Sequence, residues 1–405
     1  MLPAARLRLL PLAALVSLAS AFCPQHCRCD DARLEANCSG AQLDSFPIAL
    51  NPRLKRLLLA GGGIRQLHRN MMVSSYKQLE VLDLSRNGLR DLQLGSFAHQ
   101  HRLRELRLAG NRLSQLAPRV LAGLQQLREL DLSGNQLQSL PSGLLRTVPL
   151  LEDLNLADNQ LHLLPADSLL PQLAVLDLSS NRLAQLDGGD LVLPELTHLS
   201  LAGNRLARLD SAAFADLGSL RRLVLSDAGL ARLEGVTFAP LAQLEELYLD
   251  GNRLRRLGGE PLRVLPRLRL LSVSGCPLLS ALEPDAFAAG PALQELLIER
   301  NPRLTAVPAG AFLRLPRLRR LSLRANALAW LPADACAWPR LQAGLGDNPW
   351  LCDCALRWLA EAANNDSWGG AACAHPPALR GRPVSGLSAE ELGCAPHRTR
   401  TWGET

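Results

Sequence analysis

The sequence is dominated by one pattern, L-x-x-L-x-L-x-x-N-x-L, which recurs every 22 to 25 residues. Residues 127–137 (LRELDLSGNQL) and 151–161 (LEDLNLADNQL) are representative. A fixed period of this length is typical of chains built from stacked repeats. The twelve repeats begin at Leu54, Leu79, Leu103, Leu127, Leu151, Leu173, Leu196, Leu220, Leu244, Leu268, Leu293 and Leu318. A degenerate thirteenth repeat ends at Asn348-Pro349-Trp350.

The leucine spacing predicts the structure of each repeat. The central L-x-L has the period of a β-strand with one buried face. One short strand cannot bury its leucines alone, so neighbouring repeats must stack and form a single parallel sheet. The pattern therefore predicts an α/β fold, a repeat solenoid with a parallel β-sheet whose free face is concave.

An asparagine follows most of the predicted strands, where the chain turns inward. Its amide can pair with backbone groups of neighbouring turns that would otherwise be buried without partners. We therefore expect a ladder of asparagines, interrupted at Gly62, Ala228 and Cys276. Its members are Asn87, Asn111, Asn135, Asn159, Asn181, Asn204, Asn252, Asn301 and Asn326. The second halves of five repeats carry phenylalanines that we expect to fill the convex side of the core: Phe97, Phe214, Phe238, Phe287 and Phe312.

Residues 1–21 have the form of a secretory signal peptide. Arg6 and Arg8 precede an apolar stretch from Leu9 to Leu18, and Ala19-Ser20-Ala21 has the small residues of a cleavage site. The stretch is too short to span a bilayer, and no later segment offers 18 uninterrupted apolar residues. We therefore expect a protein secreted to the extracellular space, without a transmembrane span in this chain. If the natural chain continues further, it would instead be a receptor ectodomain at the cell surface.

Eight of the ten cysteines form two clusters that flank the repeats. In an exported chain, such clusters indicate disulfides, and the close C-x-C sulfurs argue against zinc. The first cluster, with the spacing C-x3-C-x-C-x8-C, is Cys23, Cys27, Cys29 and Cys38. The second, which begins C-x-C, is Cys352, Cys354, Cys373 and Cys394. Spacing alone leaves the connectivity open.

The capped array resembles the extracellular leucine-rich repeat proteins. The segment opening Cys23-Pro24 is similar to the N-terminal cysteine cap of that family, and residues 348–359 (NPWLCDCALRWL) are similar to its C-terminal cap. Slit-like, Nogo-receptor-like, Toll-like and acid-labile-subunit-like proteins share these caps. The resemblance implies a right-handed, curved horseshoe with disulfide-bonded ends. The pairings that it implies are Cys23–Cys29, Cys27–Cys38, Cys352–Cys373 and Cys354–Cys394.

The expected division of the chain follows from these features. It comprises a signal peptide (1–21), an N-terminal cap (22–53), the repeat array (54–347), a C-terminal cap (348–395) and a polar tail (396–405). Cys276 replaces a ladder asparagine, and Cys336 lies about two repeats later on the convex side. Because this separation and the different faces disfavour a bond between them, we expect two buried free thiols.

The sequence shows no residue pattern typical of catalysis. Its eight histidines have no metal-ligand spacing, and no G-x-S-x-G, H-E-x-x-H or phosphate-binding loop occurs. We therefore expect no enzymatic activity, no cofactor and no metal. The 44 basic and 38 acidic residues give a net charge of +6, which is typical of a mixed surface rather than one that binds nucleic acid.

The concave face of the sheet is the expected functional surface, because its outward side chains are not needed to fill the core. We interpret its N-terminal half as an acidic stripe that steers a basic partner, and its C-terminal half as an apolar anchor. Calcium is disfavoured because the aspartates of alternate repeats lie too far apart to share one ion. The candidate binding residues are Asp83, Glu105, Glu129, Asp131, Asp153, Asp177, Val224, Tyr248, Leu270 and Leu297. An ordinary solvated face is the alternative for each of them.

We therefore expect a binding protein whose partner is another extracellular protein, either a ligand or a receptor, as in adhesion or signalling. The alternatives are a cell-surface receptor ectodomain of innate-immune or neuronal type and a component of the extracellular matrix. The sequence leaves the oligomeric state open. Two glycosylation sequons occur, at Asn365 and at Asn37, and the cysteine in the middle of the second weakens it.

Overall fold

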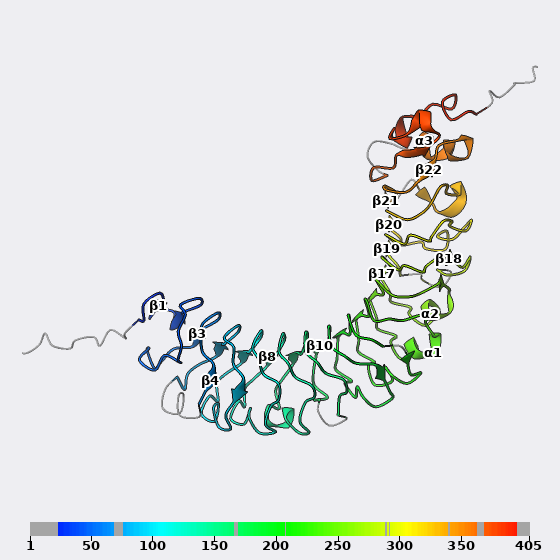
Figure 1. The fold of residues 1–405 in the computed structure, drawn as a ribbon. Coiled ribbons are helices and arrows are strands. Elements are labelled where there is room, and N and C mark those ends of the chain that lie inside the picture. Colours follow the sequence, from blue (N-terminus) through cyan, green and yellow to red (C-terminus); the bar gives the residue numbers. More distant parts are fainter. Residues whose placement is uncertain are drawn as a thin grey trace, which may run out of the picture.

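The chain forms one continuous curved solenoid whose two ends stand well apart (Figure 1). The computed structural model describes residues 23–68, 76–165, 169–206, 208–287, 290, 292–338, 341–362 and 368–394. The expected signal peptide (1–21) and polar tail (396–405) lie outside the described residues.

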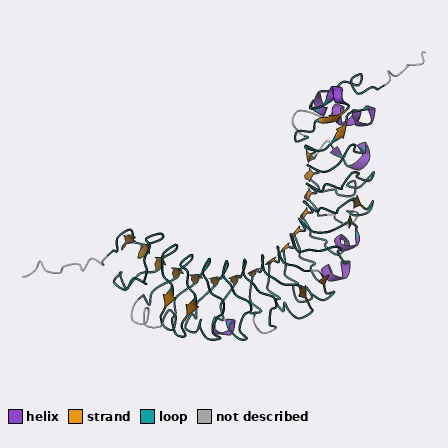
Figure 2. Cartoon of the chain, in the orientation of Figure 1, coloured by secondary structure: helices purple, strands orange, loops and turns teal. Residues whose placement is uncertain are grey.

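A 15-stranded sheet lines the concave side of the solenoid (Figure 2). Its first two strands form an antiparallel pair, and all later neighbours pair in parallel. After the pair come one strand from each of the twelve repeats and one from the degenerate thirteenth, so the predicted solenoid is confirmed. The strands are β1 (Arg28–Asp30), β2 (Glu35–Asn37), β3 (Arg56–Leu58), β5 (Val81–Asp83), β7 (Glu105–Arg107), β8 (Glu129–Asp131), β9 (Asp153–Asn155), β10 (Val175–Asp177), β12 (His198–Ser200), β14 (Arg222–Val224), β15 (Glu246–Tyr248), β17 (Leu270–Ser272), β19 (Glu295–Leu297), β20 (Arg320–Ser322) and β21 (Gln342–Gly344).

The remaining elements of the described chain are short, so turns make up most of the convex side. Paired two-residue strands lie behind the main sheet: β4 (Gln66–Leu67) with β6 (Asp91–Leu92), β11 (Gln185–Leu186) with β13 (Arg208–Leu209), and β16 (Arg256–Leu257) with β18 (Ala281–Leu282). The C-terminal cap pairs β22 (Trp350–Leu351) with β23 (Cys373–His375). The helices are α1 (Gly235–Phe238), α2 (Glu260–Arg263) and α3 (Arg357–Ala362), with 3-10 turns at Leu145–Thr147, Ala333–Ala335, Cys354–Leu356, Pro377–Leu379 and Val384–Gly386.

The strand leucines form one continuous core along the solenoid. Leu57, Leu106 and Leu223 occupy the middle of their strands and are fully buried. The five phenylalanines are buried as well, and the rings of Phe214 and Phe238 lie 5.9 Å apart in successive repeats. Both sets pack as predicted, and the burial of their apolar area stabilises every repeat against its neighbours.

The predicted asparagine ladder is present. Asn111 donates its amide hydrogens to the carbonyl oxygens of Leu84 (3.0 Å) and Leu108 (2.8 Å). Its Oδ1 accepts the N–H groups of Asn87 (3.1 Å) and Leu89 (3.0 Å) from the preceding turn. Asn111 thus satisfies buried backbone groups of two turns at once and joins them.

Cysteine takes over part of this role at one of the interruptions. The Cys276 N–H donates to Asn301 Oδ1 at 2.9 Å, and its sulfur lies 3.7 Å from the carbonyl oxygen of Leu249. Burial raises the pKa of the Cys276 thiol to about 11. Cys336 is also buried and free, so neither thiol is bonded, as expected.

Disulfides close both ends of the solenoid. The bonded pairs are Cys23–Cys29, Cys27–Cys38, Cys352–Cys373 and Cys354–Cys394, the pairs that the family resemblance implies. At the C-terminal end, the ring of Trp338 from the repeat array packs with those of Trp358 and Trp368 from the cap, with centroids 5.1 to 6.3 Å apart. The caps cover apolar core and sheet edge that would otherwise be exposed.

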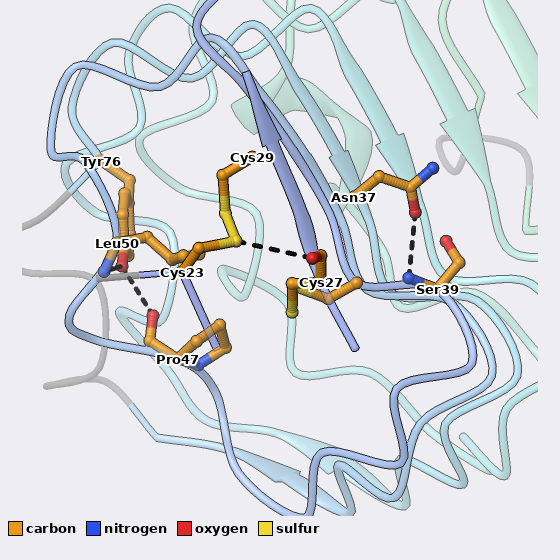
Figure 3. Close-up of a disulfide and its surroundings, with 9 residues drawn as sticks. Cys23, Cys27, Cys29, Asn37, Ser39, Pro47, Leu50 and Tyr76 are labelled. Atoms are coloured by element: carbon orange, nitrogen blue, oxygen red, sulfur yellow. Dashed lines mark hydrogen bonds between the residues drawn. A yellow bond between two sulfur atoms is a disulfide. The ribbon is translucent and has the colours of Figure 1, made fainter. Parts of the chain in front are cut away.

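Tyr76 fastens the N-terminal cap to the repeats (Figure 3). Its hydroxyl donates to the carbonyl oxygen of Pro47 at 2.7 Å and accepts the Leu50 N–H at 3.1 Å. The ring is buried and packs edge-on against Phe46, with the centroids 5.9 Å apart. Burial raises the pKa of this phenol, so the hydroxyl keeps its proton and remains a donor.

Replacing Asn111 by alanine should destabilise the array, because buried backbone groups in two turns lose their partners. We expect the free energy of unfolding to fall by about 2–4 kcal/mol. Denaturant unfolding of the disulfide-intact protein measures this. The control is Gln136→Ala at a neighbouring exposed position, which should change stability by less than about 0.5 kcal/mol. Equal effects of the two changes would contradict the role assigned to the ladder.

Replacing Tyr76 by phenylalanine should loosen the N-terminal cap while leaving the other end intact. The change leaves the Leu50 N–H and the Pro47 carbonyl without their partner, at a cost of about 1–3 kcal/mol. Hydrogen exchange should show faster exchange of the Leu50 amide and unchanged exchange in the C-terminal repeats. Uniform loss of protection along the chain would argue against a local role.

Candidate functional site

The concave face of the main sheet carries all ten predicted binding residues. Each lies on a strand of this sheet. The first and third residues of every strand face outward, and they form two parallel rows along the solenoid. Strand register places Glu105, Glu129 and Asp153 in successive positions of one row. Tyr248 and Leu297 occupy the other row, separated by Ser272. Rows of this kind arise because stacking aligns equivalent positions of consecutive repeats.

The N-terminal half of the face brings acidic side chains together. Glu105, Glu129, Asp131 and Asp153 line one hollow of about 170 Å³. Asp177 lies one strand beyond, in register with Asn155. Asp83 belongs to the same row as Asp131 but is separated from it by Arg107, which forms an ion pair with Glu105. The acidic group therefore consists of Glu105, Glu129, Asp131, Asp153 and Asp177, with Asp83 at its margin.

The carboxylates of this acidic group repel one another. Burial raises the pKa of Asp153 above its usual value, and the nearby carboxylates of Glu129, Asp131 and Asp177 raise it further. His198, two strands away, acts in the opposite direction. A bound cationic group would relieve the repulsion between these carboxylates.

Turn backbone holds several of the carboxylates in place. Asp83, Asp131 and Asp177 each accept the N–H of the serine two residues later, at 2.8 to 2.9 Å. These bonds restrain the aspartate side chains at the end of each strand. The recurring D-x-S motif in the sequence could have predicted that these aspartate side chains are held by the serine amides.

In the C-terminal half of the face, Tyr248 is held by charged neighbours. Its hydroxyl donates to Glu246 Oε2 at 3.0 Å, and Arg222 pairs with the same oxygen at 2.6 Å. The Arg222 guanidinium carbon lies 4.7 Å from the centroid of the Tyr248 ring. Burial raises the pKa of this phenol, and the bond to Glu246 adds to the effect. The ring is therefore a restrained, half-buried group on the concave face.

The expected apolar anchor is not one continuous patch. Val224, Tyr248, Leu270 and Leu297 are all half-buried. However, Leu270 lies in register between Glu246 and Glu295. Ser272 and Ser322, which occupy the same row as Tyr248 and Leu297, are buried, because neighbouring strands cover such small side chains. Val224 and Tyr248 are direct neighbours in register, but Ser272 separates Tyr248 from Leu297, and Leu270 lies in the other row.

A hollow at the C-terminal end of the face escaped the sequence analysis. It has a volume of about 620 Å³ and is lined by Arg320, Arg324, Asp347 and the backbone of Gly344 and Gly369. Arg324 pairs with Asp347 at 2.9 Å. Small residues at exposed strand positions could have indicated this hollow. Gly369, however, comes from the cap, and its distance in the sequence hides its contribution.

The two sequons differ in what the structure describes. Asn37 ends β2, and its Oδ1 accepts the Ser39 N–H at 3.0 Å (Figure 3). The intervening Cys38 is buried in a disulfide. Asn365 lies outside the described residues. Both sites stay predictions.

The described residues contain neither a cluster of metal ligands nor a membrane-spanning helix. In the part of the chain that the structure describes, no three His, Cys, Asp or Glu side chains are grouped to hold a metal ion. No helix among these same residues has the length and apolar character needed to cross a bilayer.

Several curated proteins resemble parts of this chain. Leucine-rich repeat and fibronectin type-III domain-containing protein 4 of Rattus norvegicus is 36% identical over 126 residues, which are 28% of this chain and 19% of that protein. The platelet glycoprotein Ib beta chain of Homo sapiens is 36% identical over 119 residues, 28% of this chain and 46% of the relative. The matches thus cover less than half of either relative.

Solved structures share the fold over most of the chain. A leucine-rich repeat protein of Leptospira interrogans superposes with a TM-score of 0.67 at 26% identity, covering 80% of this chain and 87% of that one. A chain of the Toll–Spatzle complex of Drosophila gives 0.66 at 23% identity, covering 87% and 54%, and shows the fold alone. A chain of the octameric Latrophilin 3, Unc5D and FLRT2 complex gives 0.52 at 25% identity, covering 92% and 100%.

The family assignment rests on the repeats themselves. The leucine-rich repeat family matches eight overlapping stretches: 52–113, 77–137, 101–161, 125–183, 171–230, 194–254, 220–278 and 266–328. Together they run without a gap over more than half of the chain. The disulfide-bonded ends agree with the cysteine caps of extracellular members. This chain belongs to the leucine-rich repeat family.

Proposed function

We propose that this protein is secreted, is not an enzyme, and binds another extracellular protein through its concave face. The observation that carries the proposal is the acidic group on neighbouring strands: Glu105, Glu129, Asp131 and Asp153 line one hollow together with Arg107, and Asp177 lies one strand beyond. Like charges placed side by side destabilise a fold, so a surface that keeps them together is suited to a ligand of opposite charge.

The acidic group would attract a basic surface of the partner. Opposite charges speed diffusional encounter and fix the orientation of the two proteins. Because Asp131 and Asp177 are already held by turn amides, their carboxylates lose little freedom on binding. The steering would weaken as salt screens the charges.

Tyr248 would supply the anchor at the other half of the face. Tyrosine offers a large contact area with few rotatable bonds, and such residues carry much of the energy at interfaces. Arg222 and Glu246 restrain this ring before binding. The anchor is therefore Tyr248 with Arg222 and Glu246 around it, and Val224 lies beside it on the neighbouring strand β14.

The comparisons are compatible with such a role. A chain of similar fold occurs in the octameric complex of Latrophilin 3, Unc5D and FLRT2. The platelet glycoprotein Ib beta chain is a relative over part of its length. Four disulfides are also typical of an oxidising, extracytoplasmic compartment.

Binding should require both halves of the concave face. A partner is captured from extracellular medium on immobilised protein and identified by mass spectrometry, and its affinity is then measured by surface plasmon resonance. We expect Tyr248→Ala to weaken binding by about 2 kcal/mol, roughly 30-fold, mainly through faster dissociation. We expect Asp131→Asn combined with Asp177→Asn to slow association and to reduce its salt dependence.

The matched control changes two exposed aspartates away from the concave face, Asp216→Asn and Asp334→Asn. It alters the net charge by the same amount and should leave binding unchanged. If the concave variants bind like wild type, or if the control loses as much affinity, the concave face is not the binding surface.

Neutralising Asp153 should stabilise the free protein. Because the folded-state pKa of Asp153 is raised, the stability associated with this group is present below its unfolded-state pKa of about 3.9 and is lost as pH rises through the folded value. Asp153→Asn should therefore raise the unfolding midpoint at pH 7 while weakening the binding of a basic partner. Thermal unfolding at pH 7 and at pH 4 measures this, with Asp216→Asn as the control. A loss of stability at pH 7 would show that Asp153 is not strained by its neighbours.

A further inference from the structure

One flank of the solenoid is far more basic than the chain as a whole. We define the turn flank as one segment of seven or eight residues in each repeat. The segment begins at the residue before the ladder position, so it comprises residues 61–67 in the first repeat and 325–331 in the twelfth. Its acidic residues are Asp91, Asp158 and Asp227. Its thirteen arginines are Arg65, Arg86, Arg90, Arg112, Arg182, Arg205, Arg208, Arg232, Arg253, Arg255, Arg256, Arg300 and Arg303.

Backbone hydrogen bonds place these arginines along one side of the molecule. The N–H of Arg182 donates to the Leu161 carbonyl at 2.8 Å, and the N–H of Arg205 donates to the Leu183 carbonyl at 3.0 Å. The N–H of Arg253 donates to the equivalent carbonyl of the turn before it. Each turn thus stacks on the previous one, and equivalent arginines fall in line along the solenoid.

The charge is densest from repeat six to repeat nine, residues 180–257. The turn flank carries seven of its arginines there, against Asp227 alone. Among the described side chains of this stretch of the flank, Arg232 forms an ion pair, with Glu234 at 3.1 Å, whereas none is formed by Arg205 or Arg253. Arginines at the margin of the sheet behave differently, because residues such as Arg221 pair with carboxylates of the next repeat.

A notch marks the centre of this stretch. Arg205 and Arg253 border a hollow of about 470 Å³ whose floor includes Gly229 and Gly251. Gly229 leaves a gap between Arg205 and Arg253, which occupy the equivalent position of the two neighbouring turns, and the gap lies beside the ladder interruption at Ala228. Asp227 is the one acidic residue lining the notch. The notch therefore presents two exposed guanidinium groups on either side of an open space.

We propose that the turn flank of repeats six to nine binds a linear sulfated polysaccharide of the glycosaminoglycan class. Guanidinium groups bind oxyanions through paired, charge-assisted hydrogen bonds. A row of such groups matches a chain that repeats its anionic groups along its length. Among the described residues, the exposed large apolar side chains of this stretch, Val192 and Val236, lie outside the turn flank. Leu209, Leu230 and Leu233 of the flank line a separate hollow of about 360 Å³ beside Arg232.

This surface is separate from the concave face of the proposed function. A polysaccharide on the turn flank would leave the acidic group free for a protein partner. The two proposals stand independently, because the flank residues take no part in the concave-face test. The whole-chain charge of +6 conceals this arrangement, since most acidic residues lie elsewhere.

The test is retention of the mature protein on immobilised heparin. Wild type should remain bound above the physiological ionic strength of about 0.15 M. The triple variant Arg205→Ala, Arg253→Ala and Arg255→Ala should elute at lower salt, and the slope of log affinity against log salt should fall by about 2 to 3, as for other polyanion contacts. Asp227→Asn should elute later than wild type, and asparagine tolerates the positive φ of 53° at this position.

The matched control removes three exposed arginines outside the flank, Arg119→Ala, Arg314→Ala and Arg317→Ala. It lowers the net charge equally and should elute close to wild type. Circular dichroism and thermal unfolding verify that each variant folds. Equal losses in the two triple variants, or release of wild type below physiological salt, would overturn the proposal. Binding of polyglutamate or duplex DNA as tightly as heparin would overturn the assigned ligand class.

Discussion

The buried asparagine ladder is the interaction on which the rest of the structure depends. A repeat with one three-residue strand has too little core to be stable alone, and its tight turn leaves backbone groups buried. Residues such as Asn111 satisfy those groups in two turns together. Leucine burial supplies the driving force, and the ladder sets the register in which neighbouring turns meet.

Because buried leucines and asparagines stabilise the fold, the exposed strand positions can vary and serve binding. The middle residue of each strand is buried in the core, so the outward residues of β7 to β10 can include five carboxylates without disturbing the packing. The arrangement still carries a cost, because Asp153 is partly buried among like charges. A fold selected for stability alone would be expected to neutralise such a position.

Charge is segregated by face although the composition is nearly balanced. The concave face is acidic in its N-terminal half, whereas the turn flank is basic in its middle repeats. Regular stacking explains how this is possible, since one repeat position becomes one row on the surface. A solenoid can therefore present two surfaces of opposite charge to two different ligands at the same time.

The sequence by itself determined the solenoid, its strands, its buried leucines and its ladder, because each depends on contacts between equivalent positions about 24 residues apart. It also placed the acidic row, since strand period decides which residues face outward. Only the tertiary structure showed that Arg222 and Glu246 hold Tyr248, that Ser272 is covered, and that Gly369 of the cap helps form a hollow. These features depend on side-chain size and on contacts between unlike positions, which a repeating pattern does not encode.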